Sequence, residues 1–375
     1  MSTGAILTLM AVSVALSLWR LWRSDGASGW RFADVPRIAS GSAEFETVLD
    51  HDSALGQAHS PSILTRADGF SVMWFEGSAE AQADVDLFEV SITRAADGRW
   101  IAGAAERRVT RAALGEAMEP RQLVVTLGNT IEDEATPGGL FVTVVSVGGW
   151  AMASVARVTM GPTGPIHARR LDMSPVLGRS NLVKSPMVAY EDGSHALPAY
   201  FEMGQMHGLW VRFARDGRVA DLRRMDGRGL KPIQPMVVPL DTHHAVAFLR
   251  DFDVTRQRLL TCRTEDGGRS WSEVRETGIF NPSAPVAALA LGDGRILMAA
   301  NDDPEAPNDL CLSLSADGGE SWTRCHRFEG DGEALRYPML RGLGAGRIAL
   351  CYSHGTKRGI RAHLMTLGWI EAQAE

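Results

Sequence analysis

Short apolar stretches alternate with turn sequences along almost the whole chain after residue 30. Stretches such as FSVMWF at 70–75 and LFVTVVSV at 140–147 are rich in β-branched and aromatic residues, which favour strands. The turns between them contain Asp-Gly or Gly-Gly pairs, which tolerate the backbone angles of tight turns. No long segment with a helical period of 3.6 residues interrupts the alternation, so the pattern predicts an all-β protein.

The turns fall into two series, each with a period of about fifty residues. The first series has six members, near Asp68, Gly138, Asp192, Asp241, Asp293 and Ala345. The second series has five members, near Asp97, Gly161, Asp216, Asp266 and Asp317. Because each period holds two hairpin turns, it holds four strands.

Four antiparallel strands repeated at this interval are typical of a β-propeller blade, because a lone four-stranded sheet cannot bury both faces until neighbours stack around an axis. Six first turns predict six blades. The last blade lacks its second turn, since the chain stops about 30 residues after Ala345. We therefore expect its outer strand to come from the segment between Trp30 and Val48. The prediction is a monomeric six-bladed β-propeller over residues 29–375.

The amino terminus departs from this pattern. Residues 5–19 read AILTLMAVSVALSLW, an uncharged apolar run closed by Arg20 and Arg23. This run approaches the length of about 20 residues that a membrane-spanning helix needs, and it lacks the flanks of a cleaved secretory signal. We predict an N-terminal hydrophobic anchor helix and linker over residues 1–28, in contact with a membrane. The two arginines favour a cytoplasmic propeller, whereas the function argued below favours the periplasm or the cell exterior.

Composition and charge limit the function further. Hydrophobic residues make up 45% of the chain and charged residues 22%, as in globular proteins. The net charge of -7 is spread along the sequence, which argues against a nucleic-acid partner. We expect neither a metal nor a cofactor, and one disulfide is possible if the protein is exported. The cysteines show no metal-ligand spacing; they are Cys262, Cys311, Cys325 and Cys351.

Two turns of the second series are nearly identical, with TEDGGRSWSE from Thr264 and SADGGESWTR from Ser315. The acid of such a turn can accept backbone hydrogen bonds, the glycines supply positive φ, and the Trp packs over the hairpin. We interpret these residues as structural and outside the active site. They are Asp266, Trp271, Asp317 and Trp322.

Both turns resemble the S-x-D-x-G-x-x-W Asp box of sialidases, which is complete at 315–322 and nearly complete at 264–271. From about His59 to Tyr352 the chain resembles the predicted-sialidase branch of bacterial BNR-repeat proteins. Stretches such as HSPSIL, SNLVKSPMVAYEDGSHALPAYFE and RYPML carry the likeness. The resemblance implies a sialidase-like propeller that acts on carbohydrate.

A polar residue shortly before a Pro recurs in the expected innermost strands, six to eight residues before the first turns. Because these steps recur at one height, they should ring one mouth of the central channel. The loops that leave the second strands should open at the same mouth and add Glu80, Asp84, Glu202, Arg250 and Asn301. The steps themselves contribute His59, Asn129 without a Pro, Lys184, Gln234, Asn281 and Tyr337.

The resemblance implies roles for several of these residues. Tyr337 in RYP matches the nucleophile of sialidases, Asp84 matches their acid/base, and Glu202 is our choice for the carboxylate that polarises Tyr337. The first arginine of the sialidase triad is replaced by His59, which lacks a bidentate guanidinium. An acidic sugar could still be bound by Lys184, Arg179 and Arg250, with Gln234, Asn281, Asn301 and Glu80 nearby.

Three functions remain open at this point. The first is a glycoside hydrolase in which Tyr337 attacks the anomeric carbon and Asp84 protonates the leaving oxygen. The second is a polysaccharide lyase that acts on a uronic acid with His59 and Tyr337 as base and acid. The third is a propeller that binds an acidic glycan without chemistry, because fold does not fix function.

Overall fold

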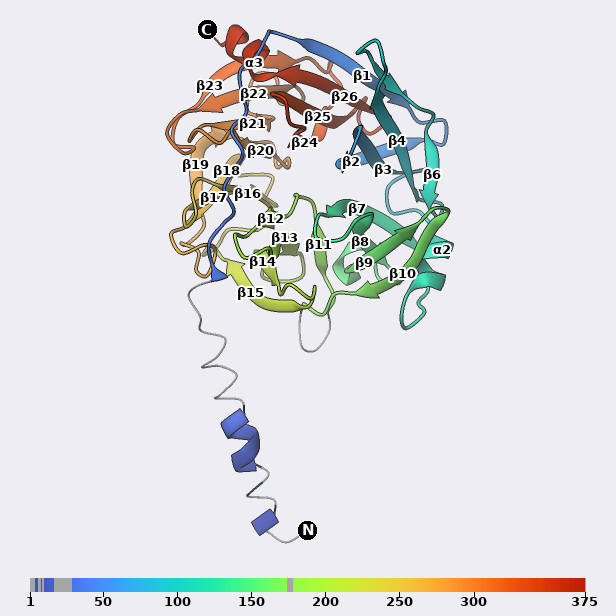
Figure 1. The fold of residues 1–375 in the computed structure, drawn as a ribbon, viewed down its shortest axis with the longest axis vertical. Coiled ribbons are helices and arrows are strands. Elements are labelled where there is room, and N and C mark those ends of the chain that lie inside the picture. Colours follow the sequence, from blue (N-terminus) through green and yellow to red (C-terminus); the bar gives the residue numbers. More distant parts are fainter. Residues whose placement is uncertain (1–3, 6–7, 9, 17–28, 174–177, 375) are drawn as a thin grey trace.

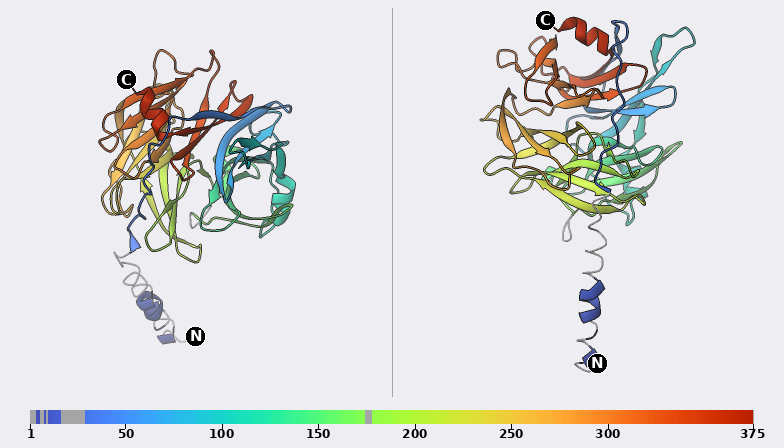
Figure 2. Two further views of the ribbon diagram at one scale, coloured as in Figure 1. Left: turned by 45° about the horizontal axis from the view of Figure 1, so that its top comes forward. Right: turned by 60° about the vertical axis from the view of Figure 1, so that its left-hand side comes forward.

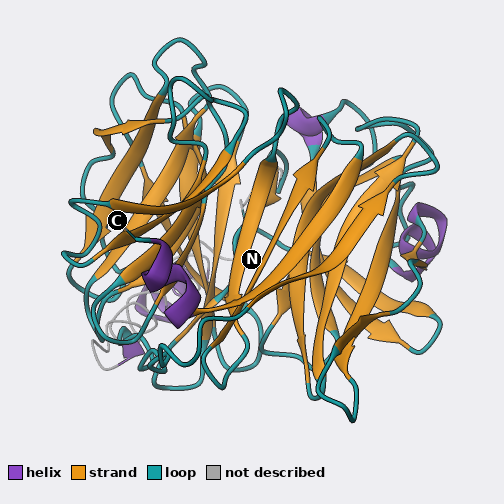
Figure 3. Cartoon of the chain, turned by 90° about the horizontal axis from the view of Figure 1, so that it is seen from above, coloured by secondary structure: helices purple, strands orange, loops and turns teal. Residues whose placement is uncertain are grey.

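In the computed structural model, which describes residues 4–5, 8, 10–16, 29–173 and 178–374, the chain forms a ring of sheets around a central channel (Figure 1). The described residues form six antiparallel sheets. Seen from above, strands make up most of the chain, and the helices are short pieces at its margin (Figure 3). The prediction of a six-bladed, all-β propeller is therefore confirmed.

In blades 1 to 3 the strands follow one another from the channel outward. Blade 1 consists of β2 (Gln57–Arg66), β3 (Gly69–Gly77), β4 (Asp86–Arg94) and β5 (Trp100–Ala102), with β6 (Glu106–Val109) also paired to β4. Blade 2 consists of β7 (Thr126–Asp133), β8 (Gly139–Val145), β9 (Ser154–Gly161) and β10 (Gly164–Arg170). Blade 3 consists of β11 (Asn181–Val183) with β12 (Val188–Ala189), then β13 (His195–Phe201), β14 (His207–Phe213) and β15 (Val219–Met225).

Blades 4 and 5 repeat this order, and blade 6 closes the ring. Blade 4 consists of β16 (Pro232–Pro239), β17 (Ala245–Asp251), β18 (Arg258–Thr264) and β19 (Arg275–Phe280). Blade 5 consists of β20 (Ala287–Ala290), β21 (Ile296–Ala300), β22 (Leu310–Ser315) and β23 (Thr323–Phe328). Blade 6 consists of β24 (Arg336–Gly342), β25 (Arg347–His354), β26 (Gly359–Thr366) and β1 (Phe45–Asp52). The short helices are α2 (Arg111–Ala117), η2 (Trp150–Met152) and α3 (Leu367–Gln373).

The ring closes as predicted, with both ends of the propeller in one blade, but the closing strand begins later than expected. β1 pairs antiparallel with β26, from Phe45 opposite Met365 to Asp52 opposite Gly359. Only the last part of the predicted segment, 45–48, belongs to this strand. Residues 30–44, here called the strap, instead run across the turns of blades 3 to 6 (Figure 2).

Two aromatic residues at the start of the strap explain its course. Trp30 and Phe32 are buried, and Phe32 stacks on Tyr190 with ring centroids 5.3 Å apart. The Phe32 N–H donates to the carbonyl of Thr242 in blade 4 at 2.8 Å. An exposed outer strand would leave both rings in water, so burial between blades 3 and 4 is favoured instead.

The predicted anchor over residues 1–28 falls largely outside the described residues, since 1–3, 6–7, 9 and 17–28 are not among them. Residues 10–16 are helical. Within the described part of the chain, no helix has both the length and the apolar character needed to cross a membrane. The anchor helix is therefore not shown, and membrane contact stays a prediction.

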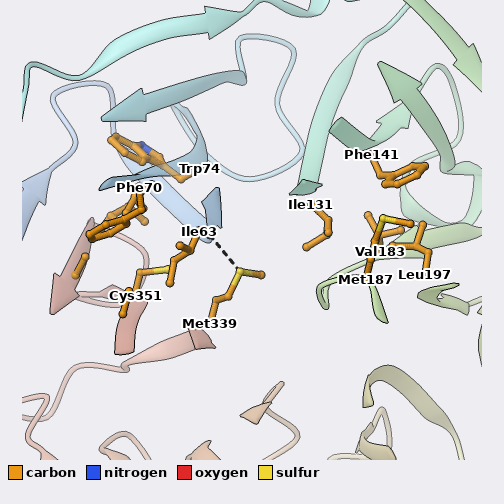
Figure 4. Close-up of a cluster of buried hydrophobic side chains, with 14 of the residues drawn as sticks. Ile63, Phe70, Trp74, Ile131, Phe141, Val183, Met187, Leu197, Met339 and Cys351 are labelled. Atoms are coloured by element: carbon orange, nitrogen blue, oxygen red, sulfur yellow. Dashed lines mark hydrogen bonds between the residues drawn. The ribbon is translucent and has the colours of Figure 1, made fainter. Parts of the chain in front are cut away.

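Apolar side chains fill the spaces between blades. One cluster joins Trp74 of blade 1 and Phe141 of blade 2 to Leu197 of blade 3 and Cys351 of blade 6 (Figure 4). Each sheet thus buries its faces against its neighbours, which is why the repeats require a closed ring. All four cysteines lie in the described part of the chain, and all are buried and free.

The two Asp boxes connect β18 to β19 and β22 to β23. The Asp317 carboxylate accepts hydrogen bonds from the Ser321 backbone N–H at 2.9 Å and from the hydroxyls of Ser321 and Ser315 at 2.6 and 2.8 Å. The Trp322 ring lies edge-on to Phe248, with centroids 5.7 Å apart. Asp266 and Trp271 hold the preceding turn in the same way.

Candidate functional site

Four of the recurrent polar steps of the innermost strands are β-bulges, at His59, Asn129, Gln234 and Tyr337. The residue before the Pro has a left-handed backbone in three blades, with φ of 54° at Ser60, 52° at Gln234 and 56° at Tyr337. Such angles are strained for residues other than Gly and concentrate at functional sites. A bulge also redirects the side chain it carries. The strand register is interrupted between His59 and Ser62, Leu127 and Thr130, Ile233 and Met236, and Arg336 and Met339.

These bulges surround a cavity of about 320 Å³ at one mouth of the channel, here called the front pocket. Loops that leave the second strands of blades 1, 3 and 4 complete its wall. The predicted convergence of residues that are distant in sequence is therefore observed for part of the set. The predicted residues that line the pocket are His59, Glu80, Asn129, Glu202, Gln234, Arg250 and Tyr337.

Tyr337 is half-buried and reaches the pocket from the first strand of blade 6. The Gln234 side-chain amide donates hydrogen bonds to the hydroxyls of Tyr337 and Tyr200, each at 3.3 Å. Burial raises the pKa of Tyr200 well above its ordinary value, and the charge of Glu202 adds to the effect. Tyr200 therefore stays protonated and serves as a hydrogen-bonding neighbour of this site.

His59 lies edge-on to Tyr337, with ring centroids 4.4 Å apart. Its Nδ1 is 2.9 Å from the Ser353 hydroxyl. Burial holds the pKa of His59 well below its ordinary value, and the positive charges of Lys357 and Arg250 lower it further. The imidazole is consequently neutral near pH 7, and the same shift makes it a weaker base than an exposed histidine.

Two carboxylates face the pocket, and their surroundings differ. Burial raises the pKa of Glu202; the positive charge of Arg250 opposes this shift in part, and the negative charge of Glu80 adds to it. Glu80 forms an ion pair with Lys357. A carboxylate with a raised pKa is a stronger base, so Glu202 is suited to accept a proton.

Two arginines supply positive charge to the pocket. Arg250 donates to the Ser283 hydroxyl at 3.0 Å and to the Gln234 side-chain oxygen at 3.3 Å. Arg336 donates to the Asn308 side-chain oxygen at 3.0 Å. Burial lowers the pKa of Arg336 to about 10, and the nearby charge of Arg250 contributes.

Within the described ranges neither Arg250 nor Arg336 forms an ion pair with a carboxylate. The Glu202 carboxylate feels the charge of Arg250 without forming an ion pair with it, so both guanidinium groups keep donors that a carboxylate could accept by charge-assisted hydrogen bonds.

Three predicted residues point into the wall of the channel and do not line the pocket. The Lys184 ammonium donates to the backbone carbonyls of Pro338 at 2.5 Å and Val286 at 3.2 Å. Asn281 accepts from the Ala284 N–H at 2.7 Å, and Asn301 donates to the Leu335 carbonyl at 3.0 Å. These side chains satisfy backbone groups that the bulges and loops leave without a strand partner.

Asp84 and Arg179 do not line the front pocket. The exposed Asp84 carboxylate accepts from the backbone N–H and the hydroxyl of Ser78 at 3.1 and 3.0 Å, and so stabilises the loop between β3 and β4. Arg179 lines a separate hollow at the edge of blade 2. Asp84 thus does not meet Tyr337 here, whereas Glu80 of the same loop lines the pocket.

Several lining residues were missed by the sequence reasoning. Arg336 directly precedes the Tyr337-Pro338 step, so its position in the motif was a usable signal. Lys357 lies in the turn between β25 and β26, which is the blade 6 counterpart of the loop that carries Glu80. The other missed residues include Trp150, Tyr200, Phe252 and Ser283.

A larger cavity of about 1180 Å³, here called the rear cavity, opens at the opposite mouth. The first turns of the blades and residues 33–38 of the strap line it. Several charged side chains that line it form ion pairs: Arg66 lies 2.8 Å from Glu89, and Arg341 lies 2.9 Å from Glu134. Among the described residues, no predicted substrate-binding or catalytic residue lines this cavity.

Comparisons with known proteins agree with this architecture. The family model of the BNR repeat-like domain matches residues 68–365. Among curated protein sequences, none matches the chain. A structure of a protein of unknown function from Dyadobacter fermentans is similar with a TM-score of 0.65 and 13% identity, over 88% of this chain and 100% of that one.

Two sialidases of known structure are also similar. A Hadza microbial sialidase has a TM-score of 0.62 and 16% identity, over 83% of this chain and 66% of that one. The NanB sialidase of Streptococcus pneumoniae has a TM-score of 0.63 and 8% identity, over 88% of this chain and 71% of that one. At these identities the likeness shows the fold alone. This chain spans about two thirds of the length of both sialidases.

Proposed function

This chain belongs to the BNR repeat-like domain family, and from that premise we propose that it is a glycosidase that processes an acidic glycan in the front pocket. The observation that carries the proposal is the placement of Arg250 and Arg336, without an ion-pair partner in the described chain, beside the strained Tyr337. The arginines favour a sugar carboxylate, and the phenol offers a nucleophile next to it.

In the proposed reaction the Tyr337 oxygen forms a bond to the anomeric carbon while the bond from that carbon to the glycosidic oxygen breaks. Glu202 takes the phenolic proton. The leaving oxygen takes a proton from the loop between β3 and β4, where Glu80 lines the pocket and Asp84 stands four residues later. A water oxygen then bonds to the anomeric carbon as the bond to the Tyr337 oxygen breaks; the loop carboxylate takes the proton of the water, and Glu202 returns its proton to Tyr337, so that hydrolysis ends with retained configuration.

A comparison of two variants of this loop identifies the residue that donates the proton. Glu80→Gln and Asp84→Asn each replace a carboxyl group by a similar-sized amide. We expect Glu80→Gln to reduce turnover of substrates with poor leaving groups more than Asp84→Asn does, because only Glu80 faces the pocket. A larger loss in Asp84→Asn would assign the proton to Asp84, as the family resemblance implies.

A second candidate, elimination by a polysaccharide lyase, is favoured by the neutral His59 edge-on to Tyr337. Here His59 would take the proton next to the carboxylate of a uronic acid, and Tyr337 would protonate the leaving oxygen. The carbon–oxygen bond then breaks and leaves a carbon–carbon double bond in the product. Arg250 and Arg336 would neutralise the same carboxylate.

Product analysis separates these functions. The chain from Gly29 onward is incubated with a panel of acidic polysaccharides, and reducing ends and ultraviolet absorbance are measured. New reducing ends without absorbance support the glycosidase, and an absorbing unsaturated sugar supports the lyase. Binding of a polysaccharide that stays intact would leave a glycan-binding propeller and contradict both enzymatic functions.

A further inference from the structure

A thin layer of side chains separates the front pocket from the rear cavity. In blade 3, Leu182 lines the front pocket and Pro186 lines the rear cavity. In blade 6, Tyr337 lines the front pocket and Leu340 lines the rear cavity. Lys184 lies between the two cavities and is 4% exposed. It occupies the break between β11 and β12 in blade 3.

Lys184 joins three blades across the channel. Its ammonium donates to the carbonyl of Pro338 in blade 6 at 2.5 Å and to that of Val286 next to blade 5 at 3.2 Å. Pro338 directly follows Tyr337 and belongs to the bulge that has no partner in β25. The lysine therefore supplies the hydrogen bond that the strand ladder cannot give to this bulge.

Such a lysine is costly if its only purpose is to fill space. A buried ammonium without a carboxylate partner is unfavourable, and an apolar side chain of similar volume commonly serves a fold better. Burial accordingly lowers the pKa of Lys184 to about 7, and the Cys351 thiol is the titratable group that opposes this shift. The cost indicates that the donor, and not the volume, is what this position requires.

We propose that Lys184 is a positioning residue, which holds the Tyr337–Pro338 bulge and thereby aims the Tyr337 hydroxyl into the front pocket. The proposal rests on the proposed function in one respect, namely that Tyr337 is the reacting group. Lys184 itself contacts only backbone carbonyls and does not line the pocket. Its effect on a reaction would pass through the left-handed backbone of Tyr337.

Two substitutions separate the donor from the volume. Lys184→Met keeps much of the length and removes the donor, whereas Lys184→Gln keeps an amide donor without charge. The chain has four tyrosines, so the ring signals of tyrosine labelled with carbon-13 are few enough to resolve by NMR. The Tyr337→Phe variant identifies the signal of Tyr337 by its loss.

We expect Lys184→Met to shift or broaden the Tyr337 signal most and Lys184→Gln to restore it, while the signals of Tyr190 and Tyr352 stay in place; Tyr200 shares the Gln234 amide with Tyr337, so a smaller change in its signal is expected. With a substrate found by product analysis, kcat should fall about tenfold or more in Lys184→Met and KM should change less than about twofold, because misplaced reacting groups lower kcat first.

Three results would overturn the positioning role. The first is an unchanged Tyr337 signal in folded Lys184→Met, and the second is an equal change in all four signals. The third is a Met variant that unfolds while the Gln variant folds, which would mean that Lys184 serves stability alone. If instead Tyr337→Phe keeps full activity, the proposed function fails while the NMR result still decides whether Lys184 positions the ring.

Discussion

The two mouths of the channel differ in how their charges and backbones are satisfied. The rear cavity is the larger, at about 1180 Å³ against about 320 Å³ for the front pocket. Several of its charged side chains nevertheless form ion pairs, such as Arg341 with Glu134. The front pocket instead holds Arg250 and Arg336, which have no ion-pair partner in the described chain, beside the strained Tyr337.

The difference shows that the size of a cavity is a poor guide to a site in this fold. A closed ring leaves a hollow at both mouths, because six blades cannot fill the channel ends. Paired charges and regular strand ends stabilise the ring, whereas unpaired charges and left-handed backbones cost stability. Features that lower stability in this way concentrate at sites where a protein binds a ligand or catalyses a reaction.

The largest expected effect comes from Tyr337→Phe at the front. Loss of a covalent or proton-transferring group lowers the reaction rate by orders of magnitude, so we expect turnover to fall at least about a thousandfold. Substrate affinity and Tm should stay close to those of the unaltered protein. Glu134→Gln in the rear cavity is the matched control and should keep full activity. Equal losses in both variants, measured as kcat on one substrate, would erase the contrast between the mouths.

The arginines of the front pocket should have the next largest effect. We expect Arg250→Ala and Arg336→Ala each to raise KM for an acidic substrate about tenfold or more, because a charge-assisted pair to the sugar carboxylate is lost. The methyl ester of that substrate carries no charge and should show almost no change. A similar loss for the acid and its ester would mean that the arginines support the wall of the pocket and do not bind the carboxylate.

A smaller effect concerns pH. If Glu202 is the base for Tyr337, it must be ionised, and burial raises its pKa in the folded protein. The acid side of the pH profile of kcat should therefore lie above the ordinary Glu value of about 4.3, with the rate rising as the pH increases through that limb. Glu202→Gln should remove the limb together with most of the rate. A limb that persists in the residual activity of this variant would assign the titration to another group.

The smallest effect is expected away from both mouths, in the Asp box. Hydrogen bonds from Ser321 and Ser315 hold the pKa of Asp317 below its ordinary value. A lowered pKa means that the ionised carboxylate stabilises the fold above about pH 4, and that this contribution is lost as the pH falls further.

Asp317→Ala should accordingly lower Tm at pH 7, and the difference from the unaltered protein should shrink in strong acid. The activity of the folded fraction should not change, because this turn does not line the front pocket. Thermal unfolding followed at several pH values checks the first point. A fall in kcat of the folded protein would connect the Asp box to the site.

The periodic features of the molecule were predictable from sequence because each blade repeats them. The polar steps at His59, Gln234 and Tyr337 recur at one distance from the first turns, so their common height followed from the repeat. The direction and length of each side chain could not be predicted from the repeat. Lys184 stands in the same series, yet its length carries the ammonium across the channel to Pro338.

Features outside the repeat could not be predicted from its period. The strap alternates apolar and polar residues near Trp30 as a strand would, and only the space between blades 3 and 4 shows why Phe32 stays there. Asp84 was assigned by resemblance, but the path of the loop places Glu80 in the pocket and Asp84 outside it. Lys357 lies in the loop that leaves the second strand of blade 6, where the repeat gives the position of the loop but not which side chain reaches the pocket.

The central claim is that the front pocket, and not the larger rear cavity, receives the carboxylate of an acidic sugar. The most direct test is a crystal structure of Tyr337→Phe, in which turnover is expected to stop, soaked with an oligosaccharide of the polysaccharide that product analysis identifies. The account predicts a sugar in the front pocket with its carboxylate against Arg250 and Arg336. A sugar bound in the rear cavity, or one in the front pocket whose carboxylate faces away from both arginines, would contradict it.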